Sequence, residues 1–316
     1  MKSLLRWLIG KRGVSTLGSW RDDYLSSKRV RLEEKTLGNY RRVINLYIEF
    51  VGEEHWPPTR FDVIRFLDDV QERASQTTTY SYWAILRAWF NYLAKVGAFG
   101  RSQNPAEQIE QLELAPHNPK KMPKGIPRQH MDLLLEYLQS LPEDLTNLRD
   151  LALIQFLYHT GARAGEAALL TREVLQLELN QVNIEAEVAK DDEDRQIFFG
   201  EKVRVILETW LSVLADSGYE GIWVFPSTRG NRALDQPLTV SGIYQMFHRR
   251  LEKVDLPKYR VHDLRHTFTK IAIRRKIALS SIQRQLGHST PDMVLRYAKA
   301  FSEDQKIDFI NFGDGE

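Results

Sequence analysis

Apolar side chains recur three and four positions apart in three stretches of the first hundred residues, which places them on one face of a helix. The predicted helices are 37–51, 62–72 and 78–93. Thr36 is the predicted N-cap of the first helix, and Gly97 ends the third. Pro57 and Pro58 open a loop between the first two. Residues 14 to about 103 are therefore predicted to form a small all-helical domain.

The pattern changes in the second half of the chain. The stretch LRDLALIQFLYHTG, residues 148–161, is apolar on nearly every side, which predicts a buried helix ended by Gly161. Apolar and polar residues then alternate from Val182 to Val188, the acidic run DDED follows, and RQIFF resumes an apolar strand. This pattern predicts a β-hairpin. Helical spacing returns from Val240 to Ala300, so the expected fold is mainly α with a small β-sheet.

A segment rich in proline and lysine separates the two halves. Its prolines are Pro105, Pro116, Pro119, Pro123 and Pro127, and its lysines are Lys120, Lys121 and Lys124. Such a segment lacks helical periodicity and is typical of a linker. The predicted organisation is a helical domain over 1–110, a linker over 111–124, and a second domain over 125–316 that ends in a tail, 301–316.

Composition narrows the class of protein. The 316 residues include no cysteine, which excludes a disulfide framework and a thiolate metal site. No apolar run approaches the length of about 18 residues that a membrane span needs, and the first residues are interpreted as an ordinary N-terminal segment. The net charge is only +2, yet residues 1–50 carry eleven Lys and Arg against five acidic residues. A basic N-terminal part favours a polyanionic partner.

Four separated pieces of the second half carry candidate chemistry. They are TGARAGE (160–166), Lys190, VHDLRHT (261–267) and LGHSTPDMVLRY (286–297). Each has an ordinary structural interpretation when taken alone. Arg163 follows a helix C-terminus, where a cation interacts favourably with the helix dipole. Lys190 could be a solvent-facing turn residue, and Tyr297 could be a packing residue of its helix. His262 and His266, four residues apart, suit a surface, a core or a zinc site.

Taken together, the pieces fit attack on a phosphodiester. A tyrosine is a competent nucleophile towards phosphorus when its proton is removed. Arginines bind phosphate oxygens bidentately and keep their charge, and a positioned histidine contributes about 10² to 10⁴ in rate as an acid or base. A lysine can protonate the departing 5′ oxygen. Because the arginines supply the electrostatic stabilisation, the set requires no metal ion.

The order and spacing of the pieces resemble the tyrosine recombinase (phage integrase) family, of the two-domain Xer-like type without a further N-terminal domain. TGARAGE resembles Thr-Gly-Leu-Arg-x-x-Glu, HDLRH resembles the His-x-x-Arg box, and a tyrosine follows the histidine of LGHS by nine positions. The catalytic residues that the resemblance implies are Arg163, Lys190, His262, Arg265, His288 and Tyr297, with Glu166 in a supporting role. The helical first half and Asn104-Pro105 also resemble the family's core-binding domain and its exit.

The hairpin departs from the family pattern. It reads AKDDEDR, with acidic residues where the family's Gly-Lys-Gly-x-x-x-Arg has glycines and another basic residue. Lys190 keeps the expected spacing to Arg195, and Lys202 is the alternative for the hairpin lysine. Met293 and Val294 replace frequent threonines without removing a catalytic atom.

The resemblance implies a two-domain C-shaped clamp around double-stranded DNA, with a SAM-like helical core-binding domain and a tyrosine-recombinase catalytic domain. It implies strand cleavage and rejoining through a 3′-phosphotyrosine, no cofactor, a cytoplasmic location and a homotetramer in the synaptic complex. The tail 301–316 is expected either to pack on its own domain or to exchange between protomers. A catalytically silent DNA-binding protein and a type IB topoisomerase-like enzyme are the alternatives.

Overall fold

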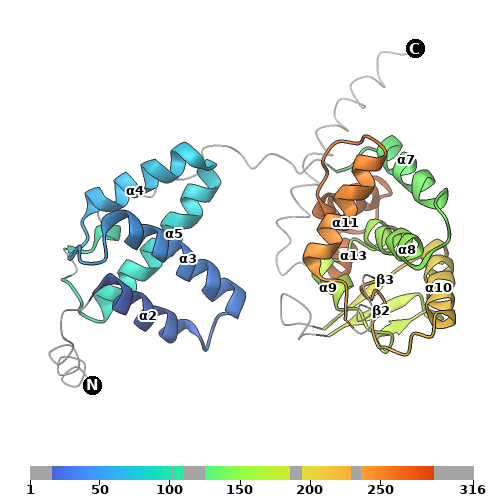
Figure 1. Cartoon of the computed structure of the whole chain (residues 1–316), viewed down its shortest axis with the longest axis horizontal. Helices are drawn as coiled ribbons and strands as arrows, with labels where there is room; N and C mark the ends of the chain where they lie inside the picture. The colour runs from blue at the N-terminus through green and yellow to red at the C-terminus, as the bar shows by residue number, and fades with distance from the viewer. Residues whose placement is uncertain are drawn as a thin grey trace, which may run out of the picture. The chain divides into compact units, whose positions relative to one another are not determined.

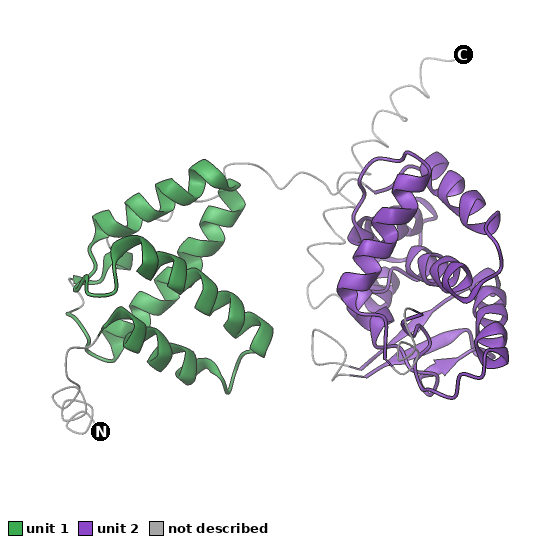
Figure 2. Cartoon of the chain, in the orientation of Figure 1, with its two compact units in different colours: residues 1–121 green, residues 122–316 purple. Residues whose placement is uncertain are grey.

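The computed structural model describes residues 16–100, 103–107, 109, 125–185, 194–228 and 236–287. The chain divides into two compact units, residues 1–121 and 122–316, drawn in green and purple in Figure 2. Helices dominate both units, and the described part of unit 2 also holds a three-stranded sheet (Figure 1). The prediction of a mainly α fold with a small β-sheet is thus confirmed. The predicted linker, 111–124, lies outside the described residues.

The regular elements in the described part of unit 1 are all helical. Its elements are α2 (Leu17–Lys28), α3 (Glu34–Val51), α4 (Arg60–Arg73), α5 (Gln76–Lys95) and the 3-10 turn η2 (Pro105–Glu107). The three predicted helices correspond to α3, α4 and α5. No helix within the described ranges of the chain is both long enough and apolar enough to span a membrane.

All three predicted helices of unit 1 begin upstream of their predicted starts, at Glu34, Arg60 and Gln76. The prediction of Thr36 as an N-cap is wrong, because α3 already begins at Glu34, after Glu33, which makes no side-chain capping bond. Helix α5 is capped by Ser75, whose hydroxyl accepts a hydrogen bond from the Thr78 backbone N–H at 3.2 Å. Apolar spacing locates the buried face of a helix, but it does not report where the backbone first becomes helical.

Aromatic side chains fill the core of unit 1. Tyr47 is fully buried and meets Phe66 and Phe90 edge-on, with ring centroids 5.4 and 5.6 Å apart. Trp89 also packs edge-on against Tyr47. Edge-to-face pairs of this kind stabilise a core by about 0.5–1.5 kcal/mol beyond the area they bury. Helices α3, α4 and α5 are therefore held together by side chains at the positions that the apolar spacing picked out.

Unit 2 combines helices with the small sheet (Figure 1). Its elements are α7 (Arg128–Gln139), α8 (Leu145–Thr160), α9 (Ala164–Ala168), β1 (Leu175–Gln176), β2 (Gln181–Ile184), β3 (Arg195–Phe198), α10 (Glu201–Asp216), α11 (Val240–Lys253), α12 (Val261–Arg274) and α13 (Leu279–Leu286). Helix α8 is buried on nearly all sides, as predicted, and it contacts α7, α10 and α12.

Gly161 ends α8 at the predicted place, and no other residue fits there. Its φ is +69°, in the left-handed region that side chains with a Cβ disfavour. A Cβ at this position would also lie 2.7 Å from a ring carbon of Phe268 and 2.8 Å from a methyl group of Leu286. Gly161 thus brings α8, α12 and α13 close together and turns the chain towards Arg163.

The sheet has the order β1-β2-β3 with antiparallel neighbours. Val182 pairs with Ile197, and Ile184 pairs with Arg195, so the apolar positions of both strands face the core. This confirms the predicted hairpin. Positions 186–193 lie outside the described residues, and they include the end of the first predicted strand and the acidic turn up to Glu193.

The entry into unit 2 is attached to α12. The backbone N–H of Ile126 donates to the hydroxyl of Thr267 at 2.7 Å, and the same hydroxyl donates to the Asp263 carbonyl at 2.7 Å. Gly125 lies so close that an added Cβ would be 3.1 Å from the Thr267 Cα. Residues 125–127 therefore lie directly against the helix that carries the HDLRH box.

Candidate active site

Arg163 is positioned by the turn after α8 and by Glu166. It is the N-cap residue of α9, and its backbone N–H donates to Glu166 Oε2 at 2.7 Å. Its guanidinium donates from Nη1 to Glu166 Oε1 at 3.1 Å. The Glu166 side chain is 2% exposed and the Arg163 side chain 21%. The Glu166 carboxylate thus holds both the backbone N–H and the guanidinium of Arg163, while the arginine side chain remains partly exposed.

Arg265 lies on α12 with 4% of its surface exposed. Its Nη1 donates to the Gly161 carbonyl at 2.8 Å, and its Nη2 donates to the Leu286 carbonyl at 2.6 Å. These two acceptors belong to the C-terminal ends of α8 and α13. Because backbone carbonyls at helix ends lack partners within the helix, a buried cation there satisfies them and also interacts favourably with the helix dipole.

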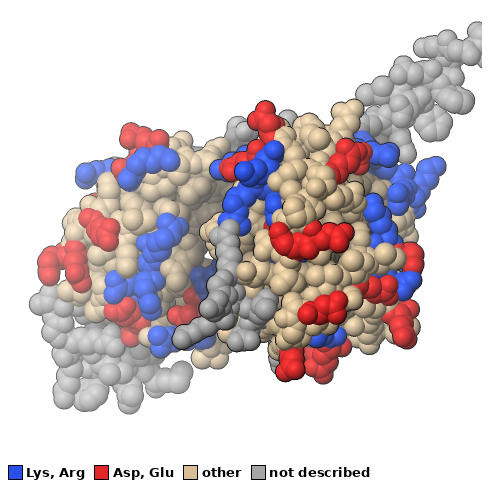
Figure 3. Space-filling model, turned by 45° about the vertical axis from the view of Figure 1, so that its right-hand side comes forward, with Lys and Arg blue, Asp and Glu red and all other residues tan. Residues whose placement is uncertain are grey.

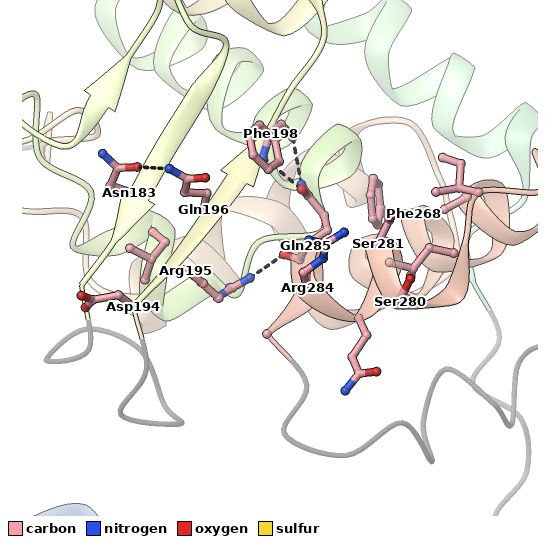
Figure 4. Close-up of a pocket in the computed structure, with 16 residues that line it drawn as sticks. Asn183, Asp194, Arg195, Gln196, Phe198, Phe268, Ser280, Ser281, Arg284 and Gln285 are labelled. Carbon is pink, nitrogen blue, oxygen red and sulfur yellow. Dashed lines mark hydrogen bonds between the residues drawn. The ribbon is translucent and has the colours of Figure 1, made fainter.

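Arg195 of β3 completes the cluster. It donates from Nη2 to Glu166 Oε1. It also donates from Nη1 to the Gln285 carbonyl (Figure 4). Glu166 therefore accepts from two arginines. Gly287, with φ +59°, lies beneath the Arg195 side chain, and a Cβ on it would be 2.6 Å from the Arg195 Cδ. The glycine of the LGHS box is thus required both by its backbone and by Arg195.

Three arginines bind three consecutive carbonyls at the end of α13. Arg195 binds that of Gln285, Arg265 binds that of Leu286, and Arg163 binds that of Gly287 at 2.6 Å. We refer to these contacts as the arginine–carbonyl clamp. Each charge-assisted hydrogen bond is worth about 1.5–3 kcal/mol. The clamp fixes the chain at the residue that immediately precedes His288.

Gln285 links the same elements through its side chain. Its Nε2 donates to the Thr160 carbonyl at 3.0 Å. The same nitrogen donates to the Phe198 carbonyl at 2.9 Å, and Oε1 accepts from the Phe198 N–H at 3.0 Å (Figure 4). The amide thereby joins α8, β3 and α13. Sequence analysis did not single out Gln285, because nothing except its place beside the LGHS box distinguishes it from a surface glutamine.

The histidines of the HDLRH box pack against each other. His262 is exposed and His266 is 6% exposed, and their rings meet edge-on with centroids 4.5 Å apart. Desolvation, followed by the nearby Arg265 cation, lowers the pKa of His262, and the charge of Arg163 contributes as well. Burial, followed by His262, lowers the pKa of His266 to about 4. Both rings are therefore neutral near pH 7.

The structure thus brings together four of the residues predicted from sequence. Arg163, Glu166 and Arg265 meet around the end of α13, and His262 lies within range of both arginine charges. Lys190, His288 and Tyr297 lie outside the described residues. The alternative lysine, Lys202, lies in the first turn of α10. It lines a pocket together with His159, and neither Arg163 nor Arg265 is among the described residues of that pocket. The described ranges contain no group of three His, Asp or Glu side chains with metal-binding geometry.

Removing the charge of Glu166 tests its role at the centre of the cluster. In Glu166→Gln, Arg163 and Arg195 lose their shared buried anion, and breaking such a pair costs about 3–5 kcal/mol. Urea denaturation should therefore show a loss of this size in the free energy of unfolding of unit 2. Glu201→Gln is the matched control, because Glu201 is exposed where it pairs with Arg204, and it should change nothing measurable. Equal effects of both substitutions would contradict the role of Glu166.

The lowered pKa of His266 predicts a pH dependence of stability. Its pKa falls from the ordinary value of 6.5 to about 4 in the folded protein, so the unfolded chain binds more protons between these values. The stabilising contribution is complete above pH 6.5 and is lost as the pH falls towards 4. At pH 5 this histidine should cost about 2 kcal/mol relative to pH 7. Comparing urea unfolding of the wild type and His266→Gln at both pH values should show a smaller loss in the variant, and equal losses would refute the assignment.

Comparisons with known proteins place this geometry in context. Residues 126–304 match the model of the phage integrase family. The chain is 26% identical over 277 residues to tyrosine recombinase XerC of Roseiflexus castenholzii, covering 84% of this chain and 83% of that protein. It is 27% identical over 270 residues to tyrosine recombinase XerD of Vibrio cholerae, covering 82% of this chain and 83% of that one.

Solved structures agree at the level of the fold. The Tn1549 transposon integrase in complex with transposon right end DNA has a TM-score of 0.72 at 18% identity, covering 93% of this chain and 99% of that chain. The XerH site-specific recombinase bound to a palindromic difH substrate has a TM-score of 0.69 at 18% identity, covering 89% and 80%. The family model matches more than half of the chain, including the TGARAGE, HDLRH and LGHS boxes. This chain therefore belongs to the phage integrase family.

Proposed function

We propose that this protein is a site-specific DNA recombinase that cleaves and rejoins DNA strands through a 3′-phosphotyrosine intermediate on Tyr297. Family membership and the similarity to the tyrosine recombinases XerC and XerD support an enzyme that breaks and rejoins DNA. The observation that carries the proposal is the convergence of Arg163 and Arg265, from distant boxes, on the chain segment that enters His288.

In the proposed reaction the Tyr297 hydroxyl oxygen attacks a backbone phosphorus. The bond from phosphorus to the 5′ oxygen breaks, and the 5′ oxygen leaves as a hydroxyl after it is protonated by Lys190. Arg163, Arg265 and His288 donate hydrogen bonds to the non-bridging oxygens, where charge builds up. A 5′-hydroxyl of a partner strand then attacks the phosphotyrosine and reverses the step, so the energy of the phosphodiester is retained.

In this scheme His262 acts as the general base that accepts the Tyr297 proton. Its lowered pKa keeps the ring neutral near pH 7, and a neutral imidazole can accept the tyrosine proton. Once it is protonated, the nearby charges of Arg265 and Arg163 favour release of that proton in the reverse step. Glu166 orients Arg163 and does not itself need to touch DNA, because its carboxylate is 2% exposed and occupied by two arginines.

The proposal includes the DNA partner and the assembly. The related Tn1549 integrase and XerH structures contain DNA, which supports double-stranded DNA as the substrate here. The proposal also includes a C-shaped clamp around the DNA, a homotetrameric synapse with exchange of the tail 301–316, and a cytoplasmic location. Residues 1–110 would act as the core DNA-binding domain and residues 125–316 as the catalytic domain.

Replacing Tyr297 by phenylalanine tests the chemistry. On a DNA site nicked so that the cleaved end diffuses away, the wild type should accumulate a covalent protein–DNA adduct. Tyr297→Phe should form none, because the nucleophilic oxygen is missing, while DNA binding in a gel-shift assay is retained. Tyr137→Phe removes the same atom from α7 and should form the adduct at the wild-type rate.

The adduct assay, together with assays of supercoil relaxation and of exchange between two sites, separates the alternative functions. Absence of an adduct with the wild type would favour a catalytically silent DNA-binding protein. An adduct together with relaxation of supercoiled DNA, but without exchange between two sites, would favour a type IB topoisomerase-like enzyme. Undiminished cleavage by Tyr297→Phe would refute the proposal outright.

Deleting residues 301–316 tests exchange of the tail. Phe309 and Ile310 lie among its apolar residues, and an apolar segment given to a neighbour would hold protomers together. The deletion, and the double substitution Phe309→Ala with Ile310→Ala, should reduce tetramer formation on paired sites, measured by native gel or analytical ultracentrifugation with DNA. Asp314→Asn is the control in the same tail and should assemble normally. Unchanged tetramer formation by the deletion variant would mean that the tail folds back on its own domain.

A further inference from the structure

Unit 2 contains a recess whose described lining residues include none of the three arginines of the arginine–carbonyl clamp. Its volume is about 630 Å³, and it is bounded by residues 125–128 and by α7, the end of α8, the start of α10 and the second half of α12. Neither Arg163 nor Arg265 is among the described residues that line it. Volumes of about 300–1,000 Å³ are usual for sites that hold small molecules.

The lining of this recess is strongly basic. Its described residues include one carboxylate and five cationic side chains, which are Arg128, Lys202, Lys270, Arg274 and Arg275. We refer to it as the basic pocket. On the face of the protein seen in Figure 3, basic and acidic side chains stand in small groups of both signs, in keeping with a net charge of +2. The excess of positive charge in the basic pocket therefore departs from the protein as a whole.

The carboxylate among the described lining residues, Asp132, pairs with Arg128. Asp132 lies 3.5 Å from Arg128, one turn along α7, and both side chains are exposed. Lys202 begins α10 and Arg275 follows α12, and both are exposed as well. Like charges that are held around one recess repel each other, and an anion placed between them relieves that repulsion.

His159 lies beside these cations. Its Nε2 is buried and has no hydrogen-bond partner, although a buried polar atom of this kind is rarely left unpaired. Burial, followed by the charges of Lys202 and Arg275, lowers the pKa of His159 to about 4. Those two cations are therefore close to the ring. An anion bound between Lys202 and Arg275 would offset the charges that act on the ring and would raise the pKa of His159.

We propose that the basic pocket binds a phosphate group, seated against His159, Lys202 and Arg275. The inference rests on the recess, its charge and the position of His159 beside two cations, and it does not depend on cleavage of DNA by Tyr297. Phosphate combines high charge with several acceptor oxygens, which suits a lysine and an arginine that line one recess. The phosphate belongs either to a free ligand such as a nucleotide or polyphosphate, or to a DNA backbone.

The pocket is placed to affect the catalytic unit. Thr267, Lys270 and Arg274 line it and lie on α12, the helix that carries His262 and Arg265. Gly125 and Ile126 line it too, and they are attached to Thr267 where the chain enters unit 2. A bound phosphate would therefore contact both the entry segment and the helix of the HDLRH box.

Binding of inorganic pyrophosphate to the full-length protein tests the proposal. Isothermal titration calorimetry should show saturable binding, and the double variant Lys202→Met with Arg275→Gln should bind at least tenfold more weakly. The control is Lys253→Met with Lys258→Met, which removes two exposed charges outside the pocket and should bind like the wild type. Absence of saturable binding, or equal weakening in both double variants, would overturn the proposal.

Histidine NMR locates the bound pyrophosphate, because phosphate can also compete at the DNA-cleaving site. The ring signals of His159, assigned with His159→Gln, should shift on titration and indicate a raised pKa. Unmoved His159 signals at saturation would overturn the proposal. A short DNA duplex added to the saturated protein identifies the source. Return of the His159 signals towards their original positions would indicate that DNA displaces pyrophosphate and supplies the phosphate, and retention would indicate a free phosphate ligand.

Discussion

The structure of unit 2 depends on three guanidinium groups that bind three consecutive carbonyls at the end of α13. Arg163, Arg195 and Arg265 come from a turn, a strand and a helix that are far apart in the sequence, and each binds a different one of these carbonyls. The end of a helix offers unpaired acceptors and a partial negative charge. The helix end therefore gathers the positive charge that a phosphodiester substrate also needs.

Concentrating arginines in a nearly buried cluster requires compensation. Glu166 supplies it, since its carboxylate accepts from Arg163 and Arg195 while 2% of its side chain is exposed. The carboxylate is buried, whereas the Arg163 side chain is 21% exposed. The two histidines add no further positive charge to the cluster near pH 7, because desolvation and the nearby cations lower the pKa values of His262 and His266.

Helix α12 connects the two basic regions of unit 2. Its first turns carry His262 and Arg265, and its later turns, with Lys270 and Arg274, line the basic pocket. The entry of the chain into unit 2 is attached to the same helix through Thr267. A ligand in the basic pocket would therefore act on the helix that also carries the proposed catalytic residues His262 and Arg265.

The sequence by itself determined the helices with clear apolar spacing, the hairpin, and the order of the boxes that carry Arg163, His262 and Arg265, because periodicity and short motifs are local properties of the chain. It did not determine the starts of α3 and α5, because apolar spacing does not report where the backbone first becomes helical. The tertiary structure alone decided the contacts of Gln285, the sharing of Glu166 with Arg195, and the grouping of His159 with Lys202 and Arg275. These depend on how α8, α10, α12, α13 and β3 pack, because hydrogen-bond partners 29 to 125 residues apart leave no periodic trace in the sequence.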